Sequence, residues 1–495
     1  MTLSPPNPNL NLNRNRNPRL GVGLGLGLRL RLGLRSRRPA NQASILIIVL
    51  WVAFGLCSIA LYFAHSMSME LKAADNTVAG IEAEQAIEGA ALYVSNVIAT
   101  LGISNNMPSP AYFRANGVKV GNATFWLVGR DTNDYAASAQ GDHPVWGLVD
   151  EASKINLNTA SIAMLENLPQ MTPNLAAATY DWRTGSNASP SVGGAKSQTY
   201  SGLNPPYLCK NAPYETIDEL SLVYGMEMDY LYGEDANLNG ILDPNENDGP
   251  LNPPNDNQNG ILEPGLFEYV TVYTVGESTV TTNGTPRVVI TNTTALSALV
   301  RSNFPSLVPY LPRTTGPAGA GGGSGRTRAS AATAAAAGSY TNVLQFYVQT
   351  GMPENQFQQI EPYLMNPSTK GLINVNTASG VVLGCIPGIG SNTAPQVLSY
   401  RQSNPPQVPS ISWLKTALGG SPSACATAGN YVTAYSYQYT ADVVAVGHFG
   451  RGYRRVRFVF DCRSGLPLIV YRQDLTYLGW ALGRKLHDQL LAQNS

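Results

Sequence analysis

The sequence predicts an α+β protein in which a long N-terminal helix packs on an antiparallel sheet and a large helical domain is inserted between the strands. Three observations predict this fold class. Residues 44–101 lack proline and change from apolar to amphipathic, two similar helical stretches recur about 218 residues apart, and stretches rich in β-branched and aromatic residues surround them. At 495 residues and 43% hydrophobic content, the chain is long enough for more than one domain.

The N-terminal region has the features of a membrane anchor. Residues 45–64 are twenty uncharged and mostly apolar residues. At 1.5 Å per residue, a helix of this length covers the roughly 30 Å hydrocarbon thickness of a bilayer. Residues 1–43 contain eight Arg and no acidic residue. The positive-inside rule therefore predicts that residues 1–43 are a basic cytoplasmic leader and that the rest of the protein lies across the membrane.

The predicted helix continues beyond the membrane. No proline occurs between Pro39 and Pro108. Apolar positions beyond residue 64 mostly keep three-to-four spacing, namely Leu71, Ala74, Val78, Ile81, Ala90, Val94, Ile98 and Leu101. This spacing predicts one helix over residues 44–101, with its first half in lipid and its second half amphipathic against the folded body.

Two stretches of the body resemble each other. Residues 154–183 begin with KINLNTAS and residues 372–401 begin with LINVNTAS. In both, Asn-Thr-Ala-Ser can cap a helix, a turn containing proline follows, and a second helix ends at Arg183 or Arg401. The inserted domain is therefore predicted to contain helix-hairpin-helix-like repeats, one in region 151–230 and one in region 339–425.

Region 231–268 between the repeats contains a predicted calcium-binding loop. Residues 235–246 match an EF-hand loop at positions 1, 3, 5, 6, 7, 9 and 12. Gly240 stands at position 6, and the expected ligands are Asp235, Asn237, Asn239, Ile241, Asp243 and Glu246, with Ile241 contributing its backbone carbonyl. A hard cation with six to eight oxygen ligands suits this set, and we expect the ion to be structural. The alternative is a polar turn without an ion.

A second run repeats the Asn-Gly-Ile-Leu core at residues 259–262. Position 12, counted from Asn255, is Leu266, so a bidentate Glu is missing at that point. Two alternatives remain open: a degenerate second calcium site, or acids that serve a neighbouring ion. The candidate ligands are Asp256, Asn257, Asn259 and Glu263.

Six stretches are expected to form strands because they are rich in β-branched and aromatic residues: 118–128, 269–275, 288–291, 431–446, 453–460 and 468–471. They place sheet strands in regions 110–150 and 426–475, and strands with a connection in region 269–312. Residues 313–338 read as a low-complexity linker, and residues 476–495 as a C-terminal tail.

The cysteines permit a disulfide but do not specify one. Four of the five would face an oxidising compartment, which allows three pairings. Cys385 with Cys425 is the favoured pair, because it would join the second repeat to the loop that follows it. Free buried thiols are the alternative.

Charge and motifs argue against catalysis and against nucleic acid as a partner. From residue 44 onward the chain has 24 basic and 32 acidic residues, a net charge of −8, which disfavours a polyanion. The four His are scattered singly, and the sequence has no HExxH, GxSxG or GxxxxGK[ST] motif. We therefore expect no enzyme activity.

The basic leader, the run SILIIVLWV and the following FAHSMSMELKAADN resemble the start of type II secretion minor pseudopilins of the K class. DEASKINLNTAS, PYETIDEL at 213–220 and the calcium run are also similar to that family, whose members bind calcium. The resemblance implies a pilin-like body and cleavage by prepilin peptidase between Ala43 and Ser44. Ile48 then stands at the fifth mature position, where other pilins carry a glutamate.

By the same resemblance, the protein is a structural subunit of the bacterial inner membrane with a periplasmic body. It assembles with the I and J minor pseudopilins and, through them, with the major pseudopilin, and it initiates or caps the pseudopilus at its tip during protein export. A bulky inserted domain would block further addition of subunits on one side, and a terminal subunit has no neighbour above to meet a glutamate at position 48.

A second resemblance gives the alternative function. INVNTAS with Gly388-Ile389-Gly390 is similar to membrane-anchored DNA receptors of the ComEA type, in which such a hairpin presents backbone N–H groups to a phosphate. The first repeat lacks both glycines, and no Lys or Arg follows Gly390 before Arg401. Phosphate binding usually needs basic neighbours, so we expect a structural hairpin.

Overall fold

The computed structural model describes residues 42–101, 107–133, 140–311 and 340–492. The chain divides into two compact units, Met1–Glu70 and Leu71–Ser495. Residues 1–41 of the predicted leader and the whole linker at 313–338 lie outside the described residues.

The described part of the first unit is helical. It is the first part of helix α1, which runs from Gln42 to Leu101. The apolar side chains from Ile45 to Phe63 are exposed, and an 18-residue window has a mean hydropathy of 2.6. One helix in the described part of the chain is therefore long and apolar enough to cross a membrane. The long N-terminal apolar helix predicted from the sequence is confirmed.

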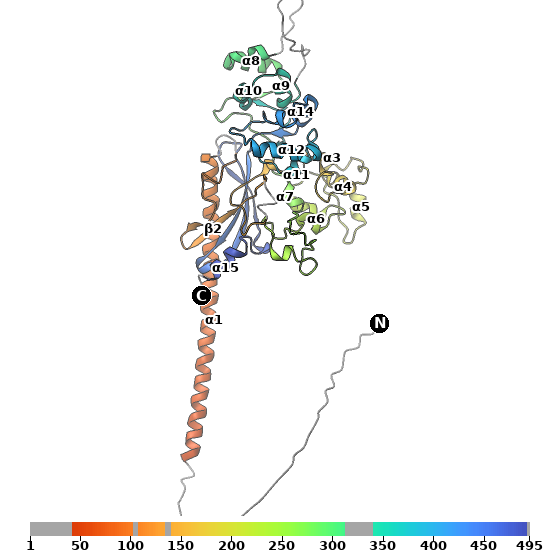
Figure 1. Ribbon diagram of the computed structural model, residues 1–495. Helices are drawn as coiled ribbons and strands as arrows, with labels where there is room; N and C mark the ends of the chain where they lie inside the picture. The colour runs from red at the N-terminus through yellow and green to blue at the C-terminus, as the bar shows by residue number, and fades with distance from the viewer. Residues whose placement is uncertain (1–41, 102–106, 134–139, 312–339, 493–495) are drawn as a thin grey trace, which may run out of the picture. The chain divides into compact units, whose positions relative to one another are not determined.

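The second unit is built on a six-stranded sheet, which lies beside the second half of α1 (Figure 1). Its strands run in the order β1-β2-β10-β11-β12, every pairing is antiparallel, and β3 also pairs with β10. The bounds are β1 Val118–Val120, β2 Ala123–Val128, β3 Val149–Asp150, β10 Gln438–Val446, β11 Arg454–Asp461 and β12 Leu468–Asp474. The predicted antiparallel sheet is confirmed, and the pairing of β2 with β10 joins strands that flank the inserted helices.

Residues of α1 in the second unit pack on this sheet through small side chains. Ala83, Ala86 and Ala90 are fully buried with apolar residues of the sheet such as Phe125, Leu127, Val443 and Phe458. Leu71, Val78 and Ile81, which were expected on the packing side, are at least half exposed. That part of the prediction was wrong, because the helix contacts the sheet through its alanine face.

The opposite face of the sheet is covered by the C-terminal segment. Residues 476–495 were read as a tail, but they form η8 Thr476–Leu478 and α15 Arg484–Ala492. Ala481 and Leu482 are fully buried in a cluster that contains Trp126, Val128, Val444 and Val446 of the sheet. The sheet therefore has α1 on one face and this segment on the other.

The two repeats fold into matching elements. The first has β4 Ile155–Asn156, α3 Ile162–Leu165 and α4 Pro173–Arg183, and the second has β8 Ile373–Asn374, α11 Gly380–Gly384 and α12 Gly390–Ser403. Ser161 and Ser379 cap α3 and α11, each with a side-chain oxygen that accepts a backbone N–H. Arg401 donates from one guanidinium nitrogen to the carbonyl oxygens of Val375 and Ala378, at 2.8 and 2.7 Å. The classification of the two repeats as helix-hairpin-helix units stays a prediction.

Each repeat is completed by a short parallel strand. β5 Val270–Thr271 pairs with β4, β9 Val432–Thr433 pairs with β8, and β6 Val288–Val289 pairs with β7 Leu364–Met365. The stretches 269–275 and 288–291 were expected in the antiparallel sheet, and this expectation was wrong. The sequence Tyr-Val-Thr occurs at 269–271 and again at 431–433, so the repeated unit includes the partner strand.

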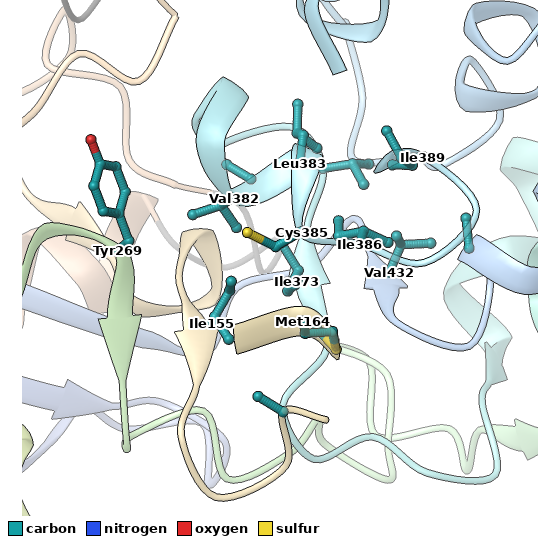
Figure 2. Packing of buried hydrophobic residues seen from close by; sticks show 14 of the residues in the cluster. Ile155, Met164, Tyr269, Ile373, Val382, Leu383, Cys385, Ile386, Ile389 and Val432 are labelled. Carbon is teal, nitrogen blue, oxygen red and sulfur yellow. The ribbon is translucent and has the colours of Figure 1, made fainter. Parts of the chain in front are cut away.

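Both repeats contribute to one hydrophobic core (Figure 2). Ile155 and Met164 of the first repeat and Ile373 and Cys385 of the second belong to the same buried cluster. The other elements of the body are η2 Glu151–Ser153, α5 Ser197–Ser201, η3 Ile217–Leu222, α6 Met228–Tyr232, η4 Pro244–Glu246, α7 Leu266–Tyr269, α8 Thr293–Asn303, η5 Pro305–Tyr310, α9 Val343–Thr350, α10 Glu354–Ile360, η6 Glu361–Tyr363, α13 Leu414–Ala417, α14 Pro422–Ala428 and η7 His448–Gly450.

Candidate calcium centre

The predicted calcium loop follows α6 and ends in η4, and its two end carboxylates are buried. Asp235 and Glu246 are each 1% exposed. Asp235 accepts the backbone N–H of Asn239 at Oδ1 and of Gly240 at Oδ2, both at 2.9 Å. Glu246 accepts the backbone N–H of Ala236 at Oε1, at 3.0 Å, and that of Asp243 at Oε2, at 2.9 Å. The carboxylates at positions 1 and 12 thus both accept backbone N–H groups from within the same short loop.

The amide side chains of the loop bond to its backbone and to a third carboxylate, Asp243. Oδ1 of Asn237 accepts the backbone N–H of Asn239 at 3.0 Å, and Oδ1 of Asn239 accepts that of Ile241 at 2.8 Å. Both amide Nδ2 atoms donate to Oδ2 of Asp243, at 2.8 and 2.9 Å. A carbonyl oxygen has two lone pairs, so each Oδ1 retains one for a cation.

Burial is the main influence on the charge of this loop. It raises the pKa of Asp235 and of Asp243. It also raises the pKa of Glu246, and the negative charge of Asp235 raises it further. Three carboxylates are therefore held where ionisation is unfavourable, and a bound divalent cation would favour their charged forms.

The donor set fits calcium rather than a softer metal. In the described part of the chain, no three His, Cys, Asp or Glu side chains converge closely enough to hold a metal by themselves. The loop must therefore combine its carboxylates with amide oxygens and the carbonyl of Ile241, which is the ligand chemistry of calcium. Calcium bound there would neutralise the carboxylates and fix the loop backbone.

The second run has the same backbone geometry as the first. Leu238 and Gln258 are non-glycine residues with positive φ, at 53° and 56°, and the glycines that follow two residues later have φ of 76° and 72°. Oδ1 of Asn257 accepts the backbone N–H of Asn259 at 3.0 Å, as Asn237 does in the first loop. Both amides again donate to the carboxylate at position 9, here Glu263, at 3.2 and 3.0 Å.

Two residues outside the second run, which its spacing did not identify, make the contacts that positions 12 and 1 make in the first loop. Glu234 accepts the backbone N–H of Glu263 at 3.0 Å and that of Asn257 at 3.4 Å, which corresponds closely to the role of Glu246 in the first loop. Asn247 accepts the backbone N–H of Gly260 at 3.1 Å, as Asp235 accepts that of Gly240. Asp256 instead accepts N–H groups of the chain around it, from Asp248, Gly249 and Gln258.

The remaining predicted site residues are not brought together. Ala43 and Ser44 lie in the first turn of α1, and their side chains are outside the described part, so the cleavage site stays a prediction. Cys385 and Cys425 are both buried free thiols in the structure. Sγ of Cys385 donates to the carbonyl oxygen of Val381, at 3.3 Å.

The hairpin that suggested DNA binding lies against a helix. A Cβ at Gly388 would stand 2.6 Å from the carbonyl oxygen of Ala424, in α14. The backbone N–H groups of Ile389 and Gly390 both donate to the carbonyl oxygen of Ile386, at 3.0 Å. These two N–H groups of the hairpin are therefore bonded within it and do not face outward to a phosphate in this conformation.

Comparison with protein families gives one match to the body. Residues 149–231 match the family described as "Type II secretion system (T2SS), protein K". Over these residues the match agrees with the family resemblance noted in the sequence. The protein K match runs from β3 through the first repeat to α6 and ends four residues before Asp235. The family is named for a component of a secretion system, not for an enzyme activity.

Comparison with curated proteins gave no match. Among solved structures, the chain is similar to one from the GspK-GspI-GspJ complex of the type 2 secretion system of enterotoxigenic Escherichia coli. The identity is 8%, the TM-score is 0.38, and the match covers 83% of this chain and 99% of that chain.

Proposed function

We propose that this chain is a minor pseudopilin of the K class, which caps or initiates the pseudopilus of a type II secretion system. The observation that carries the proposal is the protein K match over residues 149–231. These residues begin in β3 of the antiparallel sheet, which packs on α1, and continue into the inserted domain. An apolar helix joined to a sheet with a large insertion suits a subunit that is anchored in a membrane and has a folded body outside it.

The proposed place at the tip is supported by the size of the insertion and by residue 48. Between β3 and β10 the chain has more than 280 residues, which form both repeats and both loops. A subunit with such an insertion would obstruct addition of the next subunit on that side. Ile48, the proposed fifth mature residue, cannot form the charge pair that a glutamate makes with the N-terminus of a subunit above.

The proposed partners are the I and J minor pseudopilins, with the major pseudopilin joined through them. The proposed orientation places the basic leader in the cytoplasm and the body in the periplasm, because the eight Arg precede the apolar segment. Prepilin peptidase is the enzyme expected to cut between Ala43 and Ser44.

We also propose that the body binds structural calcium. The first ion takes oxygens from the loop at 235–246, with Asp235, Asp243 and Glu246 as its charged ligands. For the second loop, we propose Glu234 as the carboxylate that replaces the missing position 12, together with Asn247, Asn257, Asn259 and Glu263. The support is that both loops share a hydrogen-bond pattern, in which the amide oxygen at position 5 accepts a backbone N–H and the amide nitrogens donate to the carboxylate at position 9.

Complementation tests the proposed function directly. A strain from which this chain has been deleted, but which keeps the rest of its secretion system, should lose protein export and regain it when the full chain is supplied. A chain without residues 1–64 should not restore export, because it lacks the anchor. Normal export without the chain would reject the proposed function.

A further inference from the structure

The first calcium loop is hydrogen-bonded to the sheet through one buried arginine. Arg455 of β11 has a side chain with no exposed surface. Its Nη2 donates to the carbonyl oxygen of Leu238 at 2.8 Å, and its Nη1 donates to that of Asn237. The same guanidinium holds Asp442 of β10 through Nε and Nη2, at 2.8 and 2.7 Å.

The backbone of Arg455 bonds to the C-terminal segment, residues 475–492. Its carbonyl oxygen accepts the N–H of Leu475 at 2.8 Å, and its N–H donates to Oγ1 of Thr476 at 3.1 Å. The side chain of Arg455 thus bonds to the calcium loop, and its backbone bonds to the start of the C-terminal segment.

The loop also contacts the C-terminal segment directly. Nδ2 of Asn237 donates to the carbonyl oxygen of Trp480 at 3.2 Å. Gly483 lies so close to the loop that a Cβ on it would stand 3.1 Å from Cδ1 of Ile241 and 2.5 Å from the carbonyl oxygen of Asp142. Asn237 and Ile241 are positions 3 and 7 of the loop, so two proposed ligand residues also hold the segment.

We propose that calcium in the first loop fastens the C-terminal segment onto the sheet. The inference rests on the calcium binding proposed above. Without the ion, ionised carboxylates at Asp235, Asp243 and Glu246 would be buried with no cation to offset their charge, so the loop opens to hydrate them. The segment then loses its contacts with Asn237 and Ile241, and the guanidinium of Arg455 loses two carbonyl partners.

Release of the segment would uncover an apolar sheet face. Ala481 and Leu482 now exclude water from Trp126, Val128 and Val444, all of which are at most 4% exposed. The segment therefore acts as a strap whose closure depends on an ion bound elsewhere. Coupling of this kind is reciprocal: calcium favours strap closure by the same factor by which closure favours calcium binding, so a change that loosens the strap weakens calcium binding.

Hydrogen exchange of the full chain in detergent tests the proposal. We expect amides of residues 475–492 to exchange at least about tenfold faster in EGTA than in saturating calcium, together with those of the loop. Calcium affinity is measured separately by titration calorimetry. If calcium binds but its removal accelerates exchange only within residues 233–263, the strap is rejected and the calcium site stands. If the wild-type chain binds no calcium, both proposals fail.

A pair of glycine variants tests the reciprocity. Gly483→Ala introduces a Cβ against the loop, whereas Gly479→Ala introduces one in open space in the same segment. Both glycines have positive φ, at 79° and 85°, so each variant also bears backbone strain of its own. We expect G483A to weaken calcium binding by about fivefold or more and G479A by less than about twofold. Equal affinities for the two variants would overturn the proposal.

Discussion

The carbonyl oxygen of Leu238 accepts hydrogen bonds from two arginines, Arg130 and Arg455, each at 2.8 Å. Arg130 follows β2 and also pairs with Glu268 at 2.9 Å, whereas Arg455 lies on β11. Leu238 has a φ of 53°, and this left-handed conformation belongs to the turn of the calcium loop. Two separate parts of the sheet region are therefore bound to one strained peptide of the inserted domain.

Calcium is expected to stabilise the folded body measurably. At a free concentration of one hundred times Kd, one site contributes roughly 2.7 kcal/mol, which for a body of this size corresponds to about 3 °C in melting temperature. Asp243→Asn removes one charged ligand and keeps an acceptor for the amides of Asn237 and Asn239, so it should lose most of this gain. The measurement is thermal unfolding of each protein in calcium and in EGTA.

The exposed Glu166→Gln variant is the control for Asp243→Asn, because it removes an acidic charge from α3's C-terminal end and leaves the loop intact. It should respond to calcium as the wild-type chain does. Equal responses to calcium in D243N and in the wild-type chain would contradict the ligand assignment.

Glu361 predicts a pH dependence of stability. Its carboxyl is 2% exposed, and burial raises its pKa to about 8, although Oε2 accepts from Ser410 and Oε1 from the N–H of Ile411. Between the ordinary value of 4.5 and about 8, the folded state binds a proton that the unfolded state has lost. This contribution to stability is therefore present below pH 4.5 and is lost as the pH rises through 8.

Glu361→Gln keeps the shape of the protonated acid and removes the titration. We expect E361Q to gain stability relative to the wild-type chain as the pH rises from 5 to 8.5, by up to a few kcal/mol. Urea unfolding at each pH measures the difference. A difference that stays constant over this range would contradict the raised pKa of Glu361.

Gly452 determines how closely α1 approaches the turn between β10 and β11. A Cβ at this position would stand 2.2 Å from the carbonyl carbon of Ala79, and Gly452 has a φ of 69°. Gly465 has a φ of 91°, and a Cβ there meets nothing within 4 Å. We expect Gly452→Ala to lower the free energy of unfolding by about 2 kcal/mol more than Gly465→Ala. Equal losses in denaturant unfolding would mean that backbone strain alone is responsible.

Processing of the N-terminus is predicted at Ser44. Co-expression with a prepilin peptidase should yield a membrane-extracted protein whose intact mass corresponds to residues 44–495. Expression without the peptidase should leave residues 1–43 attached. A leader that remains in both cases would contradict the assignment of Ala43 and Ser44.

The sequence alone predicts the elements whose cause is local. The apolar run at 45–64 and the absence of proline up to Pro108 predict α1, and alternating β-branched residues predict β2, β10 and β11. The first loop is also local, because its ligands recur at a fixed spacing within twelve residues. Its backbone conformation is as expected from Gly240 at position 6, with a φ of 76°.

What the sequence did not predict depends on contacts between distant segments. Glu234 precedes the first loop but bonds to the second, 29 residues away at Glu263, so no spacing rule identifies it. Ala79 of α1 is buried where the turn around Gly452 approaches the helix backbone, whereas apolar content alone favoured Val78 and Ile81. The strand at 270–271 has the composition of a sheet strand, yet its partner is Ile155–Asn156 of the first repeat.

The central claim is that this chain is a K-class minor pseudopilin. The most direct test is whether it forms a complex with the I and J minor pseudopilins of the same system, and with what stoichiometry. The full chain, co-expressed with both partners and a prepilin peptidase, is extracted in detergent, and the mass of the purified assembly is measured. We predict one complex with a single copy of this chain bound to I and J. Recovery of this chain alone, under conditions in which I and J still associate with each other, would contradict its assignment as a K-class minor pseudopilin.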